Sequence, residues 1–200
     1  MVFLPIAGSA VVLSVRERWA PHGALAVTTA TFLLTLVPLL FFRSGQTGFL
    51  FVEKYPWISA LGISYHLGVD GLSLFLLPLT GFLSVIAVLV SWNAVKEKVK
   101  VYFVSFLVLE AAMLGVFVAL DAILFYLFWE AMLIPMFLII GIWGSQNRRY
   151  AAVKFIIYTV AGSLFLLVGF IITAFLSASL GAGFSFDVTR WGLLAVPEVH

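Results

Sequence analysis

Two acidic side chains lie inside long apolar stretches of the sequence, where charged residues are rare. Glu110 follows nine residues after the start of one stretch at Val101, and Glu130 follows eight residues after the start of the next at Ala122. An acidic residue at the middle of a bilayer costs on the order of 2.5–3.5 kcal/mol to insert, so it normally faces a protein interior or a water-filled cavity. Desolvation disfavours the charged form of a carboxyl group, and a nearby cation favours it. A buried acid whose neighbour moves can therefore take up and release a proton, and both residues are candidate proton carriers.

Three residues near Glu130 could assist such a transfer. Tyr126, four residues earlier on the same helix face, could donate its hydroxyl to the carboxylate. Pro135 has no amide N–H, so the carbonyl of Ala131 loses its helical partner and becomes a place for water to dock. Lys154 is the one lysine in or at the edge of a later apolar stretch.

Structural roles are open for each of these residues. Glu130 could be a permanently protonated acid that bonds a neighbouring helix, and Glu110 has no polar neighbours in sequence. Tyr126 is the kind of residue that often serves packing alone. Pro135 could be a tolerated kink, and Lys154 could extend to the membrane surface as a topological anchor.

The composition indicates that lipid is the solvent of this protein. Hydrophobic residues make up 64% of the 200 residues and charged residues only 10%, whereas soluble domains carry roughly 25% charged residues. There are no cysteines, which excludes iron–sulfur clusters and thiolate metal sites. The three histidines lie outside the apolar stretches, which argues against a membrane haem. We expect no redox cofactor on this chain, and the basic residues form no run that would bind nucleic acid.

Six apolar stretches are candidates to cross the membrane, since a spanning helix needs about 20 mostly apolar residues. They are residues 1–15, 23–42, 72–92, 101–120, 122–143 and 151–178. Asp121 alone separates the fourth from the fifth, which predicts an antiparallel hairpin; Glu110 lies about 14 Å into the fourth stretch from its start at Val101, and Glu130 lies about 12 Å into the fifth from its start at Ala122. The segment 43–71 is too polar to span and predicts an outer loop or short hairpin. The expected fold is all-α: a polytopic transmembrane helix bundle of about six spans, in one membrane domain over residues 1–200.

The distribution of basic residues predicts the orientation of the bundle. Loops after the first, third and fifth stretches hold seven lysines and arginines, and the alternate loops hold three, including Arg43. The positive-inside rule therefore places the N-terminus outside. Arg16 and Arg18 follow the first stretch instead of preceding it, which argues against a signal peptide. We expect a multi-pass protein of a bacterial plasma (inner) membrane.

The sequence around Glu130 resembles that of a known family. Residues 125–136, which include Trp129-Glu130-Ala131, resemble a signature of the subunit M (subunit 4) type of antiporter-like subunit in proton-translocating NADH:quinone oxidoreductase, respiratory complex I. The resemblance continues through residues 141–144, 147–155 and 158–163. Residues 65–74 resemble the family's entry to its third helix, and residues 185–187 resemble a short loop motif.

The resemblance implies an inverted repeat of helices and a role in proton translocation. Residues 1–92 would hold three leading helices, residues 101–178 the first half of the repeat, and residues 179–200 an outer loop. In the family a fifth-helix glutamate pairs with a lysine on a broken seventh helix, and this role carries over to Glu130. A fourth-helix glutamate corresponds to Glu110. The chain ends at His200 before any seventh helix, so we expect the N-terminal part of such a subunit.

Partners and cofactors follow from the same resemblance. The implied partners are other membrane subunits of the complex, among them homologous antiporter-like subunits, together with the lipid bilayer. Flavin, iron–sulfur clusters and quinone would bind to other subunits. Two alternatives are open: a cation/proton antiporter subunit, and a truncated structural subunit that does not pump protons.

Overall fold

Six apolar helices form over the six stretches that hydropathy predicts. The computed structural model describes residues 1–42, 48–181 and 183–192. Its main helices are α1 (Phe3–Ser14), α2 (Ala20–Thr35), α4 (Ser73–Ala94), α5 (Val99–Val118), α6 (Ala122–Trp143) and α7 (Arg148–Ser179). A short 3₁₀ turn, η1 (Glu17–Trp19), leads into α2, and the short helix α3 (Val37–Phe41) follows it. The prediction of a polytopic transmembrane bundle with about six spans is confirmed.

Five of these helical segments are long and apolar enough to cross a membrane. They are Glu17–Phe41, Ser73–Ala94, Val99–Val118, Ala122–Trp143 and Arg148–Ser179, and α1 is a shorter apolar helix. The segment from α2 to α3 bends at Leu36, two residues before Pro38. Proline lacks the amide proton that would continue the helical hydrogen bonds, which accounts for the break. The chain is an integral, multi-pass membrane protein.

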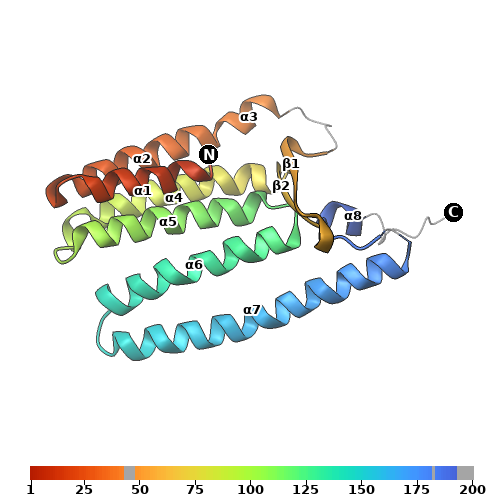
Figure 1. Cartoon of the computed structure of the whole chain (residues 1–200). Coiled ribbons are helices and arrows are strands. Elements are labelled where there is room, and N and C mark those ends of the chain that lie inside the picture. The colour runs from red at the N-terminus through yellow and green to blue at the C-terminus, as the bar shows by residue number, and fades with distance from the viewer. Residues whose placement is uncertain (43–47, 182, 193–200) are drawn as a thin grey trace.

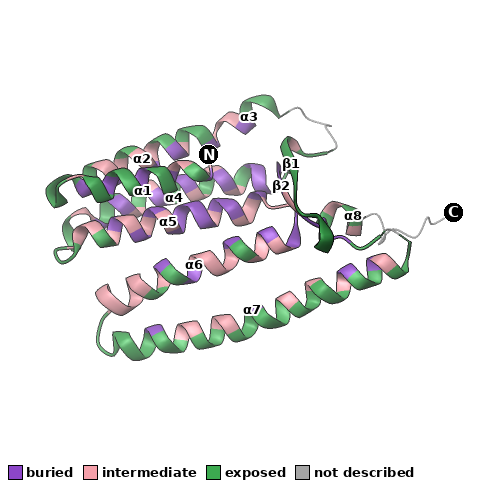
Figure 2. Cartoon of the chain, in the orientation of Figure 1, coloured by how far each residue is buried: buried purple, intermediate pink, exposed green. Residues whose placement is uncertain are grey.

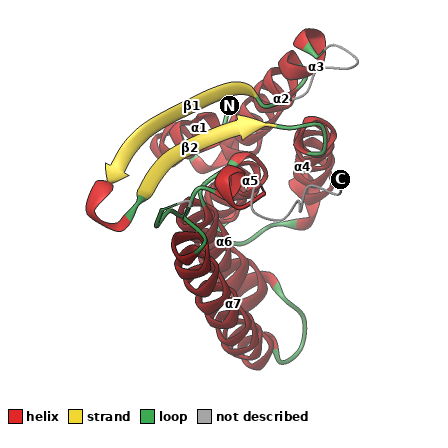
Figure 3. Cartoon of the chain, turned by 90° about the vertical axis from the view of Figure 1, so that its right-hand side faces the viewer, coloured by secondary structure: helices red, strands yellow, loops and turns green. Residues whose placement is uncertain are grey.

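The helices form a compact group with a projecting hairpin. Helices α1, α2, α4 and α5 pack together, whereas α6 packs on α5 and α7 packs along α6 (Figure 1). Seen from the end, α6 and α7 extend away from the other helices (Figure 3). Most of the surface of α7 is exposed (Figure 2). The antiparallel arrangement of α5 and α6, which the single residue between their apolar stretches predicts, is present.

A two-stranded antiparallel sheet covers one end of the bundle. Strands β1 (Leu50–Ile58) and β2 (Ile63–Val69) are joined by the 3₁₀ turn η2 (Ser59–Leu61), and Lys54 lies opposite His66 in their register. Most of β2 is buried, and β1 is exposed along nearly its whole length. The expected outer loop or short hairpin is therefore a hairpin. Residues 43–47 of that segment, including Arg43, lie outside the described residues.

The two ends of the bundle differ in charge. The hairpin end carries β1, β2, the connection between α5 and α6, and the short helix α8 (Val188–Gly192) (Figure 1). The opposite end, called here the loop end, carries the three connections that contain seven lysines and arginines. This separation agrees with the predicted orientation. Residues 193–200 of the expected outer loop 179–200 lie outside the described residues.

Small residues let the helices approach one another closely. In a membrane, apolar side chains gain little by leaving lipid for protein, so close packing stabilises the association of helices. A Cβ atom at Gly81 of α4 would lie 2.9 Å from the backbone of Phe32 in α2. A Cβ atom at Gly115 of α5 would overlap the buried ring of Phe128 in α6. The Gly115–Phe128 contact joins the two helices that carry the acidic residues.

Substituting Gly115 tests this contact. We expect Gly115→Ala to lower the free energy of unfolding by about 1–3 kcal/mol, because the added methyl group overpacks the α5–α6 interface. The matched control is Gly162→Ala in α7, where an added Cβ meets no atom within 4 Å. The control should be neutral or slightly stabilising, since alanine favours a helix over glycine by about 1 kcal/mol. Thermal unfolding of both variants in lipid nanodiscs measures the difference, and equal midpoints would contradict the packing argument.

Candidate functional site

Glu110 is enclosed completely by protein. It lies in the second half of α5 and has an exposed fraction of 0%. Neither carboxyl oxygen has a hydrogen-bond partner within the described part of the chain. Ser84 of α4 is its polar neighbour, but their geometry falls short of a hydrogen bond. A buried carboxyl group without donors is held most easily in its neutral, protonated form.

Glu130 has a defined partner on the next helix. It lies in α6, is half-buried, and its Oε1 atom lies 2.5 Å from the hydroxyl oxygen of Ser163 in α7. The same hydroxyl also lies 3.0 Å from the backbone carbonyl of Val160. A serine hydroxyl has one proton to donate and can accept a hydrogen bond through its lone pairs. Ser163 can therefore donate to a charged Glu130, or accept from a protonated Glu130 while it donates to Val160.

The other predicted site residues take different positions. Tyr126 lies one helical turn before Glu130 and near the pair of Glu130 and Ser163, but the hydrogen bond to the carboxylate comes from Ser163. Pro135 is buried inside α6, and the helix continues past it to Trp143. The Nζ atom of Lys154 lies 5.7 Å from the ring centroids of both Tyr150 and Tyr158 on its own helix.

The structure brings some of the predicted site residues together and leaves Lys154 apart from them. Glu130 and Tyr126 lie together, while Lys154 is exposed on α7 and, among the described residues, pairs with no carboxylate. Ser163 is the partner to which the sequence argument gave no role. In the sequence it is a small polar residue inside an apolar stretch and within the resembling residues 158–163. It lies 33 residues beyond Glu130, and the register between α6 and α7 is needed to bring the two together.

A second polar cluster lies at the hairpin end, and its first member is Asp121. This residue is fully buried between α5 and α6 and begins α6, with its Oδ1 atom accepting from the amides of Ile123 and Leu124. Its Oδ2 atom accepts from the amide and the hydroxyl of Ser64 in β2, at 2.8 Å and 3.0 Å. Asp121 therefore caps a helix and also attaches the hairpin to it.

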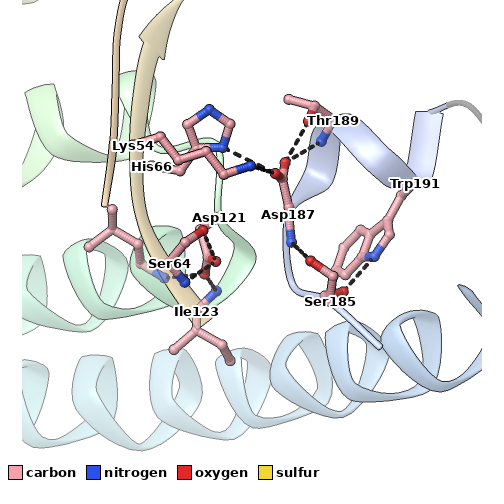
Figure 4. A network of polar contacts seen from close by, with 10 residues as sticks. Lys54, Ser64, His66, Asp121, Ile123, Ser185, Asp187, Thr189 and Trp191 are labelled. Atoms are coloured by element: carbon pink, nitrogen blue, oxygen red, sulfur yellow. Dashed lines mark hydrogen bonds and ion pairs between the residues drawn. The ribbon is translucent and has the colours of Figure 1, made fainter. Parts of the chain in front are cut away.

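Asp187 is the second buried acid of this cluster (Figure 4). Its Oδ2 atom lies 2.5 Å from the ammonium of Lys54 and 3.4 Å from Nδ1 of His66, and its Oδ1 atom accepts from the amide and hydroxyl of Thr189. Burial raises the pKa of Asp187, but the hydrogen bonds from Lys54 and Thr189 outweigh burial, so the net pKa lies below the usual range. Asp187 is therefore a stable anion at neutral pH.

Backbone hydrogen bonds connect the same segments. The amide of Leu120 donates to the carbonyl of His66 at 2.8 Å, and the amide of Val188 donates to the carbonyl of Leu120 at 3.0 Å. The amide of Ala122 donates to Phe186, also at 2.8 Å. The hairpin, the α5–α6 connection and the segment before α8 thus form one hydrogen-bonded unit. No local pattern in the sequence predicts that Lys54 and Asp121 belong to this unit, because its contacts join segments that are far apart in the sequence.

Comparisons with known proteins agree with the resemblance. A family model described as NADH:quinone oxidoreductase/Mrp antiporter, transmembrane, matches residues 119–184, which contain the whole of α6 and α7. The chain is 48% identical to NADH-quinone oxidoreductase subunit M of Rhodobacter capsulatus, over 86% of this chain and 34% of that protein. It is 41% identical to NADH-ubiquinone oxidoreductase chain 4 of Arabidopsis thaliana, over 88% of this chain and 36% of that protein.

Solved structures share the fold. A chain of respiratory complex I from Thermus thermophilus with bound NADH matches 99% of this chain and 39% of its own length, with a TM-score of 0.78 and 26% identity. A chain of the Mrp complex from Dietzia matches 92% of this chain and 19% of its own length, with a TM-score of 0.73. Its identity of 18% supports a likeness of fold alone.

The matches cover most of this chain but only part of each relative. The chain spans about one third of the length of the curated relatives that it matches. The family model covers α6 and α7, the two helices that hold Glu130 and Ser163. The alignment with the Rhodobacter protein extends over 86% of the chain. The resemblance is confirmed: the chain is a relative of subunit M, an antiporter-like membrane subunit of NADH:quinone oxidoreductase.

Proposed function

We propose that this chain carries proton-transfer residues of a membrane subunit in a proton-translocating NADH:quinone oxidoreductase. Glu130 would be the central proton carrier and Glu110 a second one. The observation that supports this most strongly is the contact of Glu130 with Ser163, because one hydroxyl lies within hydrogen-bond distance of both the carboxyl oxygen and the Val160 carbonyl. The contact therefore fits Glu130 with or without its proton.

The exchange of a proton at Glu130 would proceed in a simple way. In the charged state, Ser163 donates its proton to the carboxylate, which partly offsets the cost of holding a charge among apolar helices. When Glu130 takes up a proton, it becomes the donor and the Ser163 hydroxyl turns towards Val160. The two states differ by the rotation of one hydroxyl group, so the helices need not move to stabilise either.

Glu110 suits the role of a neutral relay. It is buried in α5, next to α6, and Ser84 of α4 is its polar neighbour. Tyr126, close to Glu130, could extend a hydrogen-bonded path with internal water. Pro135 would leave a backbone carbonyl free to bind such a water. Lys154, near the loop end, would either supply a positive charge beside the proton path or anchor α7 at the membrane surface.

The electron-transfer cofactors and the subunits that drive proton transfer would lie on other chains. Electrons would pass through flavin, iron–sulfur clusters and quinone bound to other subunits, and a conformational or electrostatic signal would reach Glu130 through neighbouring membrane subunits. Those neighbours would include homologous antiporter-like subunits. The Thermus structure that shares the fold is a respiratory complex I, an assembly of this kind. The bacterial relatives favour the plasma membrane as its location.

A cation/proton antiporter subunit is the second candidate. The likeness to the Mrp complex supports it, since the two chains share a fold. The higher identity to subunit M, 48% against 18%, favours the respiratory subunit. Copurification with a peripheral arm that contains flavin and iron–sulfur clusters would support the respiratory assignment, and sodium/proton exchange without that arm would support the antiporter.

Neutralising Glu130 tests the central role. We expect Glu130→Gln to abolish proton translocation coupled to quinone reduction, because an amide cannot release a proton, while the complex still assembles. The measurement is quenching of a pH-sensitive dye by inverted membrane vesicles supplied with NADH, with quinone reduction followed in parallel. The matched control is Glu97→Gln, an exposed residue at the loop end, which should leave pumping unchanged. Normal pumping in Glu130→Gln would refute the role and leave a structural subunit as the better description.

Removing the Ser163 hydroxyl tests the contact itself. We expect Ser163→Ala to slow proton translocation about tenfold or more, since a hydrogen bond to a charged group contributes about 1.5–3 kcal/mol. Ser163→Thr retains a hydroxyl at the same position and should recover most of the rate. The same vesicle assay measures both variants. A rate in Ser163→Ala equal to that of the unmodified protein would show that Glu130 does not depend on this partner.

A further inference from the structure

One buried carboxylate at the hairpin end faces two basic side chains. The Oδ2 atom of Asp187 lies 2.5 Å from the Lys54 ammonium and 3.4 Å from His66 Nδ1 (Figure 4). The other carboxylate oxygen already accepts two hydrogen bonds from Thr189. Lys54 and His66 are also opposite one another in the β1–β2 register. The two basic groups therefore compete for the same oxygen atom.

His66 is the unsatisfied member of this group. It is 5% exposed, and within the described residues its Nδ1 atom has no hydrogen-bond partner. A buried nitrogen without a partner is unfavourable, and protonation of Nδ1 would create a donor that points at Asp187. The geometry for an additional ion pair is thus already present, and the proton is what completes it.

Charged groups on three segments of the chain influence the pKa of His66. They are Lys54 on β1, Asp187 before α8, and Asp121 between α5 and α6. Burial lowers the pKa of His66 most; the Asp187 and Asp121 carboxylates raise it, and Lys54 lowers it again, with a net lowering. The imidazole is therefore neutral at pH 7 while Lys54 pairs with Asp187, and it takes a proton below its ordinary pKa of about 6.5.

The two partners of Asp187 differ in their access to water. The Lys54 side chain is 45% exposed and can turn its ammonium group into solvent, whereas the Asp187 side chain is 2% exposed and stays buried. Loss of the Lys54 cation from the pair would favour protonation of His66, because the carboxylate would then lack its cation. By linkage, protonation of His66 must weaken the Lys54–Asp187 contact to the same extent.

We propose that His66 is a proton-binding site at the hairpin end, where its protonation displaces Lys54 from Asp187. The proton replaces the ammonium group as the positive charge beside the carboxylate, so the buried cluster keeps its charge balance. The exchange releases the exposed strand β1 from the segment before α8, while the backbone hydrogen bonds of His66 and Leu120 hold β2 in place. This inference is independent of proton transfer through Glu130.

Amine reactivity of Lys54 tests the exchange. The full-length protein in its native membranes is treated with an amine-acylating reagent at about pH 7.5 and at about pH 5.5, on either side of the ordinary histidine pKa. Mass spectrometry gives the extent of modification of Lys54 relative to Lys96, an exposed lysine at the loop end. The ratio cancels the general effect of pH on amines. We expect the ratio to rise at least about threefold at the lower pH, as the Lys54 ammonium leaves its buried partner.

Variants identify the group responsible. In His66→Gln the ratio should stay low at both pH values, and His66→Asn repeats the test if glutamine prevents folding. In Asp187→Asn the ratio should be high at both. The matched control is His22→Gln, which removes an exposed histidine between Trp19 and Trp92 at the loop end and should retain the pH-dependent rise. A flat ratio in the unmodified protein, or an equal rise in His66→Gln, would overturn the proposal. Glu130→Gln should leave the ratio unchanged, so failure of the proposed pumping role would be seen separately.

Discussion

A carboxyl group among apolar helices must either lose its charge or have a donor or cation beside it, and this constraint accounts for the main polar contacts of the structure. Glu110 meets it by complete enclosure, with no donor in the described residues, which favours the neutral acid. Glu130 meets it through Ser163. Asp121 and Asp187 meet it with amide, hydroxyl and ammonium donors. The four acids thus divide into two that suit proton exchange and two that stabilise the hairpin end.

The helices could be predicted from the sequence because the bilayer imposes a simple rule of length and hydropathy. Each predicted stretch corresponds to a helix, and the single residue Asp121 between two stretches led to the antiparallel pair of α5 and α6. The inward faces could not be predicted in the same way. In soluble proteins the buried face is the apolar one, whereas here hydroxyl-bearing residues such as Thr28, Thr31 and Ser84 are buried while large residues such as Phe165 face outwards.

The candidate site was predictable in part, for a related reason. An acidic residue in an apolar stretch is unusual, so the sequence singles out Glu110 and Glu130 as candidates. Ser163 is ordinary in type and lies in a different helix, so its contact with Glu130 depends on how α6 and α7 pack. The same holds for Lys54 and Asp187, which are 133 residues apart. The contact between Lys54 and Asp187 depends both on the β1–β2 register and on the path of the chain after α7. No local sequence pattern predicts either of these.

The length of α7 has a consequence for the energetics of any charge that reaches Glu130. This helix has 32 residues and is about 48 Å long, and Ser163 lies at its middle, about 24 Å from either end. The partner of Glu130 is therefore near the centre of the electric field across the membrane. Moving one elementary charge across the whole membrane changes its energy by about 2.3 kcal/mol per 100 mV. Within α6, Glu130 itself lies about 12 Å from the hairpin end and about 20 Å from the loop end, so a proton reaching it from either surface would cross a substantial part of that voltage, and both legs of its passage would be electrogenic.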